Sequence, residues 1–175
     1  MSEQLLSADS ADSPTIRFRY DVETGDLGRV DEIVASTGFF NRAERAVARE
    51  LVEERLERGP ASGYHFVFCA IGEATAGYAC YGPIAGTRDS YDLFWIAVHR
   101  TFQRRGLGRA ILDDVERRIA AAGGSRIYVE TSSRDQYAPT RAFYENHGYR
   151  LEATLPDFYA PGDGKLVYVK VVRAG

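Results

Sequence analysis

The sequence predicts a mixed α/β fold in which one sheet of seven strands carries helices on both faces. Short apolar runs rich in β-branched or aromatic residues indicate strands, and apolar residues at helical spacing indicate amphipathic helices. Glycines and prolines separate these segments. In chain order the elements are a strand, two helices, three strands, a helix, a strand, a helix and two strands, an order that one two-faced sheet accommodates.

Size and composition indicate one globular domain. A chain of 175 residues can bury roughly 70% of the surface that its unfolded form exposes. The formal net charge of −3 provides no general basic field, so we expect no nucleic-acid partner. Membrane association is not expected either, because no apolar run approaches the roughly 20 residues of a membrane span. We assign residues 1–14, rich in Ser, Asp and Ala, to a mobile tail and residues 15–173 to the domain.

Cysteine and histidine usage indicates a reduced, metal-free protein. The N-terminus lacks the basic start and apolar run of a secretory signal, so we expect a cytoplasmic protein with free thiols. If the turn between their strands centres on Ala74 and Thr75, Cys69 faces Cys80, whereas a small register shift separates them. The three histidines and two cysteines form no ligand-spacing pattern, so no metal is expected.

The N-terminal third of the domain is predicted to contain a strand and two helices. Residues 15–22 alternate apolar and charged side chains, as a half-buried strand does. Residues 26–36 have helical apolar spacing and end at Gly38. Asn41 is a suitable N-cap for a second helix that runs to about residue 58. Its expected core stripe consists of Val47, Leu51 and Leu56.

Three strands and the longest apolar stripe follow. Residues 64–71 and 75–81 predict a hairpin, and residues 91–98 predict a strand that is buried on both faces from Leu93 onward. After Gly108, apolar residues recur every four positions, which predicts an amphipathic helix. The stripe consists of Leu107, Ile111, Val115 and Ile119.

The remaining segments complete the sheet. Residues 126–131 predict a buried parallel strand, and residues 139–146 a short helix with Pro139 in its first turn. Residues 149–159 and 165–172 predict two strands joined by a Gly/Pro turn.

The segment Gln103-Arg104-Arg105-Gly106-Leu107-Gly108 joins the central strand to the long helix. Its glycines allow close approach of a ligand, and the first helical turn has amides without intrahelical acceptors. With two arginines, the segment can cradle a diphosphate. The alternative is a tight turn with a solvated basic rim. Neither G-x-G-x-x-G nor G-x-x-x-x-G-K-[ST] occurs in the chain.

This segment resembles the coenzyme-A-binding motif Q/R-x-x-G-x-G/A of the GNAT superfamily of acyl-CoA-dependent N-acyltransferases. Gln103, Gly106 and Gly108 match its fixed positions. The predicted order of elements over residues 15–172 also resembles the GNAT fold, a mixed, mostly antiparallel sheet with helices on both faces. The resemblance implies an N-acetyltransferase that uses acetyl-CoA as co-substrate. It further implies an amine acceptor, either a small molecule, an amino acid or a peptide N-terminus.

The resemblance also implies how acetyl-CoA is held. Backbone groups of the central strand pair with the pantetheine amides, and an amide there, that of Val98, polarises the thioester carbonyl. Arginines and helix amides hold the diphosphate. The implied cofactor-binding residues are Ile96, Ala97, Val98, Gln103, Arg104, Arg105, Gly106, Leu107, Gly108 and Arg109.

Glu130 is the candidate general base. An alkyl amine has a pKa near ~10.4, so a base, acting through water, must take a proton at neutral pH. Glu130 lies within an otherwise apolar strand, where desolvation would raise its pKa towards neutrality. Members of the superfamily that acetylate peptide N-termini often carry a glutamate at this place. The alternative is a structural carboxylate paired with a Thr, Ser or Arg side chain.

Tyr144 is the candidate general acid. The run Ala142-Phe143-Tyr144-Glu145-Asn146-His147-Gly148-Tyr149 resembles the superfamily signature A-x-Y-x-x-x-G-[FY]. The resemblance implies that the tyrosine hydroxyl protonates the departing thiolate, although a core tyrosine bonded to backbone is the alternative. Many members have an asparagine seven residues before this tyrosine, whereas this chain has Tyr137. This chain therefore lacks the asparagine side chain that binds the pantetheine arm in those members.

Aromatic residues are the candidates for the acceptor side. Phe39, with its neighbour Phe40, and Tyr159 could contact the amine. Packing is the commoner role of adjacent aromatics in a short loop, and a position at the hairpin edge explains Tyr159 at least as well. Two other functions remain open from the sequence: a non-catalytic acyl-CoA-binding sensor, and a dimeric interaction module that uses the C-terminal hairpin. A homodimer is also compatible with an enzyme. The acceptor, the acyl chain and the oligomeric state are not determined by the sequence.

Overall fold

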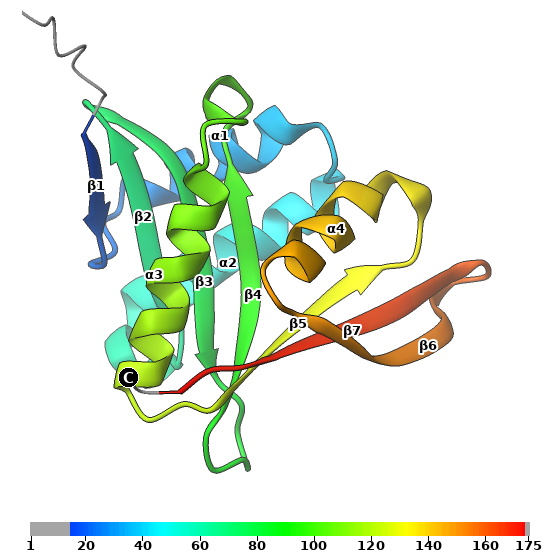
Figure 1. Ribbon diagram of the computed structural model, residues 1–175. Coiled ribbons are helices and arrows are strands. Elements are labelled where there is room, and N and C mark those ends of the chain that lie inside the picture. Colours follow the sequence, from blue (N-terminus) through cyan, green and yellow to red (C-terminus); the bar gives the residue numbers. More distant parts are fainter. Residues whose placement is uncertain (1–14, 174–175) are drawn as a thin grey trace, which may run out of the picture.

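The computed structural model describes residues 15–173 and contains one seven-stranded sheet (Figure 1). The predicted tail, residues 1–14, lies outside the described residues. The strands are β1 (Ile16–Arg19), β2 (His65–Ile71), β3 (Ala74–Pro83), β4 (Ser90–Val98), β5 (Arg126–Ser132), β6 (Arg150–Ala160) and β7 (Asp163–Val171). The helices are α1 (Asp26–Thr37), α2 (Arg42–Arg58), α3 (Leu107–Ala121) and α4 (Ala138–Asn146). The predicted order of elements is confirmed.

The sheet is mixed, as predicted. Its strand order is β1-β2-β3-β4-β5-β7-β6, and β4 and β5 are its parallel neighbours. All other neighbouring pairs are antiparallel. Within the part of the chain that the structure describes, no helix is both long and apolar enough to cross a membrane.

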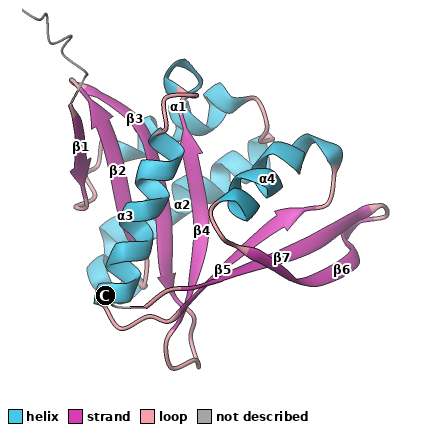
Figure 2. Ribbon diagram, in the orientation of Figure 1, coloured by secondary structure: helices cyan, strands magenta, loops and turns pink. Residues whose placement is uncertain are grey.

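Helices cover the two faces of the sheet in pairs (Figure 2). Helices α1 and α2 pack on one face, in a cluster that includes Phe68, Tyr78 and Cys80 from β2 and β3. Helices α3 and α4 pack on the opposite face, in a cluster that contains Cys69 and Val129. The predicted stripe of α3 is buried at all four positions, Leu107, Ile111, Val115 and Ile119.

The core-facing side of α2 differs from the prediction. Val47 and Leu56 are exposed, while Ala48 and Val52 are completely buried and Leu51 packs at the edge of the core. Ala48 and Val52 therefore form the face of α2 that packs on the core, while Val47 faces solvent. Apolar size alone therefore predicted the wrong helix face. The N-terminus is as expected, because Asn41 accepts hydrogen bonds from Ala43 N and Glu44 N.

The hairpin of β2 and β3 separates the two cysteines. Ile71 pairs with Ala74 across a two-residue turn, so a turn centred on Ala74 and Thr75 is wrong. Cys69 faces Gly77, whereas Cys80 faces Phe66, and the two thiols point to opposite faces of the sheet. Both cysteines are free and buried. Burial raises the pKa of Cys69 to about 11.

Strands β4 and β5 pair only at their first residues. Ser90, Tyr91 and Asp92 pair with Arg126, Ile127 and Tyr128, after which the two strands diverge (Figure 1). From Leu93 onward, the edge of β4 that faces β5 has no strand partner in residues 15–173. The sheet is therefore split in the middle, and this split positions the candidate site.

A buried carboxylate stabilises the start of α1. Asp26 is fully buried and accepts hydrogen bonds of 2.7 and 2.8 Å from Arg19 and of 2.9 Å from Arg29. Burial opposes ionisation of this carboxyl group, but the hydrogen bonds from Arg19, the Glu23 amide and Arg29 outweigh it and lower its pKa. Because the folded-state pKa is depressed, this stabilisation is present above the unfolded value of about 3.9 and is lost as the pH falls through the folded value.

Replacing Asp26 by Asn is therefore expected to lower the free energy of unfolding by about 3 kcal/mol at pH 7. The estimate is at the low end for a broken buried pair, because Arg19 and Arg29 remain partly exposed and water can solvate them. Urea unfolding at pH 7 measures the effect. The control is Asp31→Asn, which removes a partly exposed pair with Arg45 and should cost no more than about 1 kcal/mol. Equal losses in the two variants would contradict the prediction.

Candidate active site

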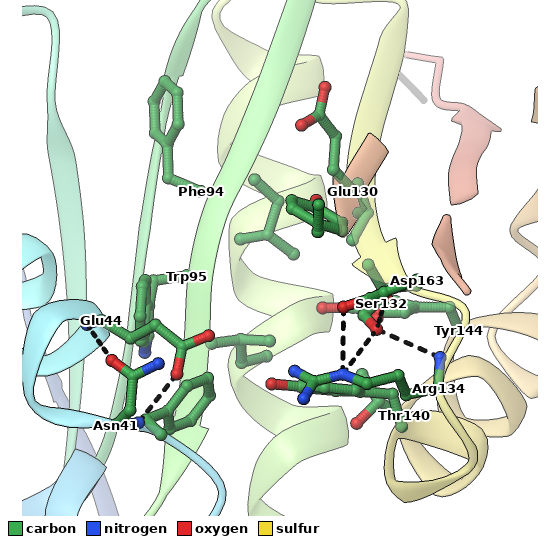
Figure 3. Close-up of a pocket in the computed structure, with 17 residues that line it drawn as sticks. Asn41, Glu44, Phe94, Trp95, Glu130, Ser132, Arg134, Thr140, Tyr144 and Asp163 are labelled. Carbon is green, nitrogen blue, oxygen red and sulfur yellow. Dashed lines mark hydrogen bonds and ion pairs between the residues drawn. The ribbon is translucent and has the colours of Figure 1, made fainter. Parts of the chain in front are cut away.

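A cleft of about 440 Å³ opens where β4 and β5 diverge. Its walls come from the start of α2, from β4, from β5 and its connection to α4, from α4 itself, and from the β6–β7 hairpin. Figure 3 shows Asn41 and Glu44 on one wall and Ser132, Arg134 and Asp163 on the opposite one. The cleft has aromatic residues such as Trp95 on its floor and charged residues on its walls, and this lining suits a small polar molecule.

The open edge of β4 presents backbone amides to the cleft. His99 N donates to Ala76 O in the β3 direction at 2.8 Å. Because successive amides along a strand point to opposite edges, the amides of Val98 and Ile96 point towards β5, where β4 has no strand partner in the described chain. An extended molecule that contains amides could therefore bind along this edge as an additional strand would.

The junction between β4 and α3 leaves the helix N-terminus without a side-chain cap. Gly106 is the N-cap residue, with φ of 76°, and no side chain bonds the first-turn amides there. Gln103 Nε2 donates to Val98 O at 3.0 Å and so ties the turn to the end of the strand. These amides face a second hollow of about 460 Å³, which Phe143 and His147 also line. The site suits an anion such as a phosphate.

The arginines of this junction differ in their partners. Arg104 and Arg105 form no ion pair with any residue in the range 15–173, whereas Arg109 lies 3.6 Å from Asp113. The guanidinium of Arg105 lies 5.6 Å from the centre of the Phe102 ring. Two positive charges thus remain free at the positive end of the α3 dipole.

The ten predicted cofactor-binding residues lie along one path, but not all can use their side chains. Ile96 lines the cleft, and Val98 lines the second hollow together with most residues of the 103–109 junction. The side chains of Ala97 and Leu107 are buried in opposite core clusters, so only their backbone could contact a ligand. Helix α4 also spans both hollows, through Tyr144 in one and Phe143 in the other.

Tyr144 extends from α4 to the cleft wall (Figure 3). Its side chain is only 4% exposed and packs against the rings of Phe143 and Tyr149, both at 5.4 Å between centroids. Burial raises the pKa of Tyr144 above its ordinary value. The phenol therefore remains protonated at neutral pH and can serve as a hydrogen-bond or proton donor.

Glu130 lines the cleft, but its environment differs from the predicted one. Its side chain is 51% exposed and forms a 2.8 Å ion pair with Lys165. The expected desolvation is wrong because the core layer under α1 and α2 contains no residue of β5, so this face of β5 is uncovered. The alternative Thr, Ser or Arg partner is wrong as well, since the partner is a lysine on β7.

The sequence interpretation overlooked a second carboxylate next to Glu130. Asp92 is the last β4 residue that pairs with β5, at the closed end of the split. Burial and then the charge of Glu130 raise the pKa of Asp92, while Lys165 lowers it. The sequence does contain a signal for Asp92, because it is a charged residue within the apolar strand 91–98. Glu130 was identified by the same kind of signal in its own strand.

Not all of the predicted acceptor-side aromatics line the cleft. Tyr159 lines it and is half exposed. Phe40 lines it, with its ring 4.9 Å from that of Trp95. Phe39 is exposed and does not line the cleft, and its ring lies 6.5 Å from that of Tyr137. Over residues 15–173, no group of three or more His, Cys, Asp or Glu side chains is arranged to hold a metal ion.

The acetyltransferase (GNAT) family model matches residues 30–149, which include the open strand β4, the uncapped helix α3 and Tyr144. The chain belongs to the GNAT acetyltransferase family. The family assignment confirms the resemblance read from Gln103, Gly106 and Gly108.

Two known proteins agree with the assignment. A putative GNAT acetyltransferase from Desulfovibrio desulfuricans superposes with a TM-score of 0.88 and 47% identity, over 90% of this chain and 99% of that one. The ribosomal protein bS18-alanine N-acetyltransferase of Escherichia coli K12 is 32% identical over 77 residues, 44% of this chain and 51% of that protein, so the match spans about half its length.

A structure of lower identity contains acetyl-CoA. A putative acetyltransferase from Salmonella typhimurium, solved with its cofactor acetyl-CoA, has a TM-score of 0.67 at 17% identity, over 89% of this chain and 93% of that one. At this identity the likeness supports the fold alone. In this GNAT chain, the residues fit the coenzyme on their own geometry, since free amides along β4 lead directly to free amides and two unpaired arginines at α3.

Proposed function

We propose that this GNAT protein transfers the acetyl group of acetyl-CoA to a primary amine by direct attack in a ternary complex. The observation that carries the proposal is the continuity between the open edge of β4 and the uncapped N-terminus of α3. An extended arm with amides fits the first, and a diphosphate fits the second. The coenzyme has both parts in this order.

The chain would hold acetyl-CoA mainly through backbone groups. First-turn amides of α3, together with Arg104 and Arg105, would bind the diphosphate. The strand edge from Ile96 to Val98 would pair with the pantetheine arm, and the amide of Val98 would donate to the thioester carbonyl oxygen. Charge-assisted bonds to phosphate are roughly twice as strong as neutral ones, so the arginines account for a large share of the affinity.

Two side chains would handle the protons. Glu130 would accept a proton from the acceptor amine through a water molecule, and Tyr144 would donate one to the leaving thiolate sulfur. Burial raises the pKa of the Tyr144 phenol. The same burial would also raise the pKa of the coenzyme A thiol that leaves beside it, so the thiolate could still accept the phenol proton. The proposal includes no acetyl-cysteine intermediate, because Cys69 and Cys80 are both buried and neither lines the cleft.

The acceptor belongs to one of three classes: small amines, free amino acids and peptide N-termini. The related Escherichia coli enzyme acts on an alanine of ribosomal protein bS18. A peptide that begins with alanine is therefore one member of the acceptor panel, beside polyamines and amino acids.

Binding and turnover assays test the proposal together. Calorimetry should detect acetyl-CoA binding, and a thiol reagent should detect release of coenzyme A that depends on an added amine. Binding without amine-dependent release across the panel would favour the acyl-CoA sensor instead. Absence of both binding and release would overturn the acetyltransferase proposal.

Replacing Glu130 by Gln is expected to lower the turnover number about 100-fold, the lower end for general base catalysis, because bulk water can partly substitute for a half-exposed carboxylate. The KM for acetyl-CoA should stay unchanged. Steady-state kinetics at one pH near neutrality measures both constants, with Glu73→Gln in the distant β2–β3 turn as control. A turnover number equal to that of the wild type would remove Glu130 as the base.

A further inference from the structure

We infer that Arg134 anchors a carboxylate of the acceptor, so that the acceptors are small amines that also carry a carboxylate, such as free amino acids. The inference rests on the proposed acetyl transfer and specifies its substrate class. It would make Arg134 a specificity-determining residue on the wall of the cleft opposite Asn41 and Glu44 (Figure 3).

The guanidinium of Arg134 is held from one side only. Its Nε lies 3.0 Å from Asp163 Oδ2 and donates to Ser132 Oγ at 3.4 Å. Asp163 and Ser132 are each 8% exposed, and Ser132 Oγ donates to the other carboxylate oxygen of Asp163. A buried, hydrogen-bonded carboxylate thus fixes the Nε side of an arginine whose own side chain is 49% exposed.

The outer end of the same guanidinium is free. Neither terminal nitrogen of Arg134 bonds to another residue between positions 15 and 173. Figure 3 shows this end pointing away from Asp163 towards the middle of the cleft and the wall of Glu44. Two terminal nitrogens in one plane match the two oxygens of a carboxylate, which is the geometry that arginine recognises best.

An aromatic ring further restrains this side chain. The guanidinium carbon of Arg134 lies 5.5 Å from the centre of the Tyr137 ring, which itself lines the cleft. Tyr137 occupies the position where many GNAT members have asparagine. The ring and Asp163 together leave Arg134 little rotamer freedom to lose on binding, so recognition of a carboxylate would cost little entropy.

The other charged residues of the cleft also favour an acceptor whose carboxylate lies at Arg134. Lys165 is already paired with Glu130, so it does not compete for a substrate carboxylate. Glu44, on the opposite wall, would repel such a carboxylate. The acceptor would therefore bind with its carboxylate at Arg134 and leave its amine free to reach Glu130 and Tyr144.

Matched substrate pairs test the anchor. Neutral amino acids with different amine-to-carboxylate separations are compared with their carboxamides, which keep the amine and lose the negative charge. Polyamines and a peptide that begins with alanine complete the panel. The wild type should acetylate at least one free acid with a kcat/KM that is roughly tenfold to hundredfold higher than that of its carboxamide.

Variants assign the preference to Arg134. Arg134→Gln should raise the KM for the free acid roughly tenfold to hundredfold, with kcat and the KM for the carboxamide nearly unchanged. Arg134→Lys keeps the charge beside Asp163 but loses the planar fork, so it should fold normally and retain part of the preference. The control is Arg49→Gln on α2, which removes an arginine of similar exposure, 47%, outside the cleft.

The outcomes separate this inference from the proposed function. Turnover with carboxamides, polyamines or the peptide that equals or exceeds turnover with the free acids would overturn the anchor and leave the acetyltransferase intact. An equal loss for acids and carboxamides in Arg134→Gln and Arg134→Lys would overturn it too, since that is what a purely structural ion pair predicts. Absence of transfer to any amine would overturn both.

Discussion

Replacing Tyr144 by Phe is expected to lower the turnover number by about 10²- to 10⁴-fold while the affinity for acetyl-CoA stays nearly unchanged. The substitution removes one oxygen and keeps the ring contacts with Phe143 and Tyr149. Little stability should therefore be lost. Single-turnover rates at saturating acetyl-CoA and amine measure the effect on the chemical step.

The control for Tyr144 is its neighbour Tyr149. Tyr149→Phe removes a buried hydroxyl that has no hydrogen-bond partner among the described residues and does not line the cleft. Its turnover should equal that of the wild type. Because burial raises the pKa of Tyr144, the wild-type rate should also show no alkaline decline from this residue below about pH 10. Unchanged turnover in Tyr144→Phe would remove the phenol from the mechanism.

Replacing Gly106 by Val is expected to weaken acetyl-CoA binding by at least roughly 100-fold, because about two charge-assisted hydrogen bonds to the diphosphate would be lost. Gly106 has φ of 76°, and an added Cβ would meet no atom within 4 Å. The substitution therefore acts through the backbone, because a β-branched residue is strained at positive φ. Relief of that strain would rotate the first-turn amides of α3 away from the diphosphate.

A second glycine provides a close control for Gly106. Gly86 has φ of 78° and equally open surroundings, but lies in the loop before β4, away from both hollows. Gly86→Val should carry a similar strain and bind acetyl-CoA like the wild type. Calorimetric titration compares the three proteins at one temperature. Equal affinities for wild type and Gly106→Val would contradict the assignment of the diphosphate site to α3.

Local patterns predicted the elements around the site well. The four-residue spacing from Leu107 to Ile119 gave the correct face of α3, and Asn41 is the N-cap that its side chain suggested. The buried face of α3 and the N-cap of α2 both depend on residues that are close in sequence. The face of α2 was mispredicted because Ala48, whose small size permits close packing, counted for less than Val47.

Long-range relations explain what the sequence did not predict. Glu130 belongs to a strand that reads as buried, yet one face of β5 is open because the layer of α1 and α2 ends at β4. The environment of Arg134 depends on Asp163, which reaches it only through the pairing of β5 with β7. Neither relation leaves a local pattern of spacing or composition.

The most direct test of acetyl transfer follows the acetyl group itself. The protein is given acetyl-CoA with a heavy-isotope label in the acetyl group, together with the acceptor panel, and the products are weighed by mass spectrometry. We expect a labelled N-acetyl amine and free coenzyme A in equal amounts, both dependent on the amine and both strongly reduced in Tyr144→Phe. Bound acetyl-CoA that remains intact in the presence of every amine would contradict the proposed function.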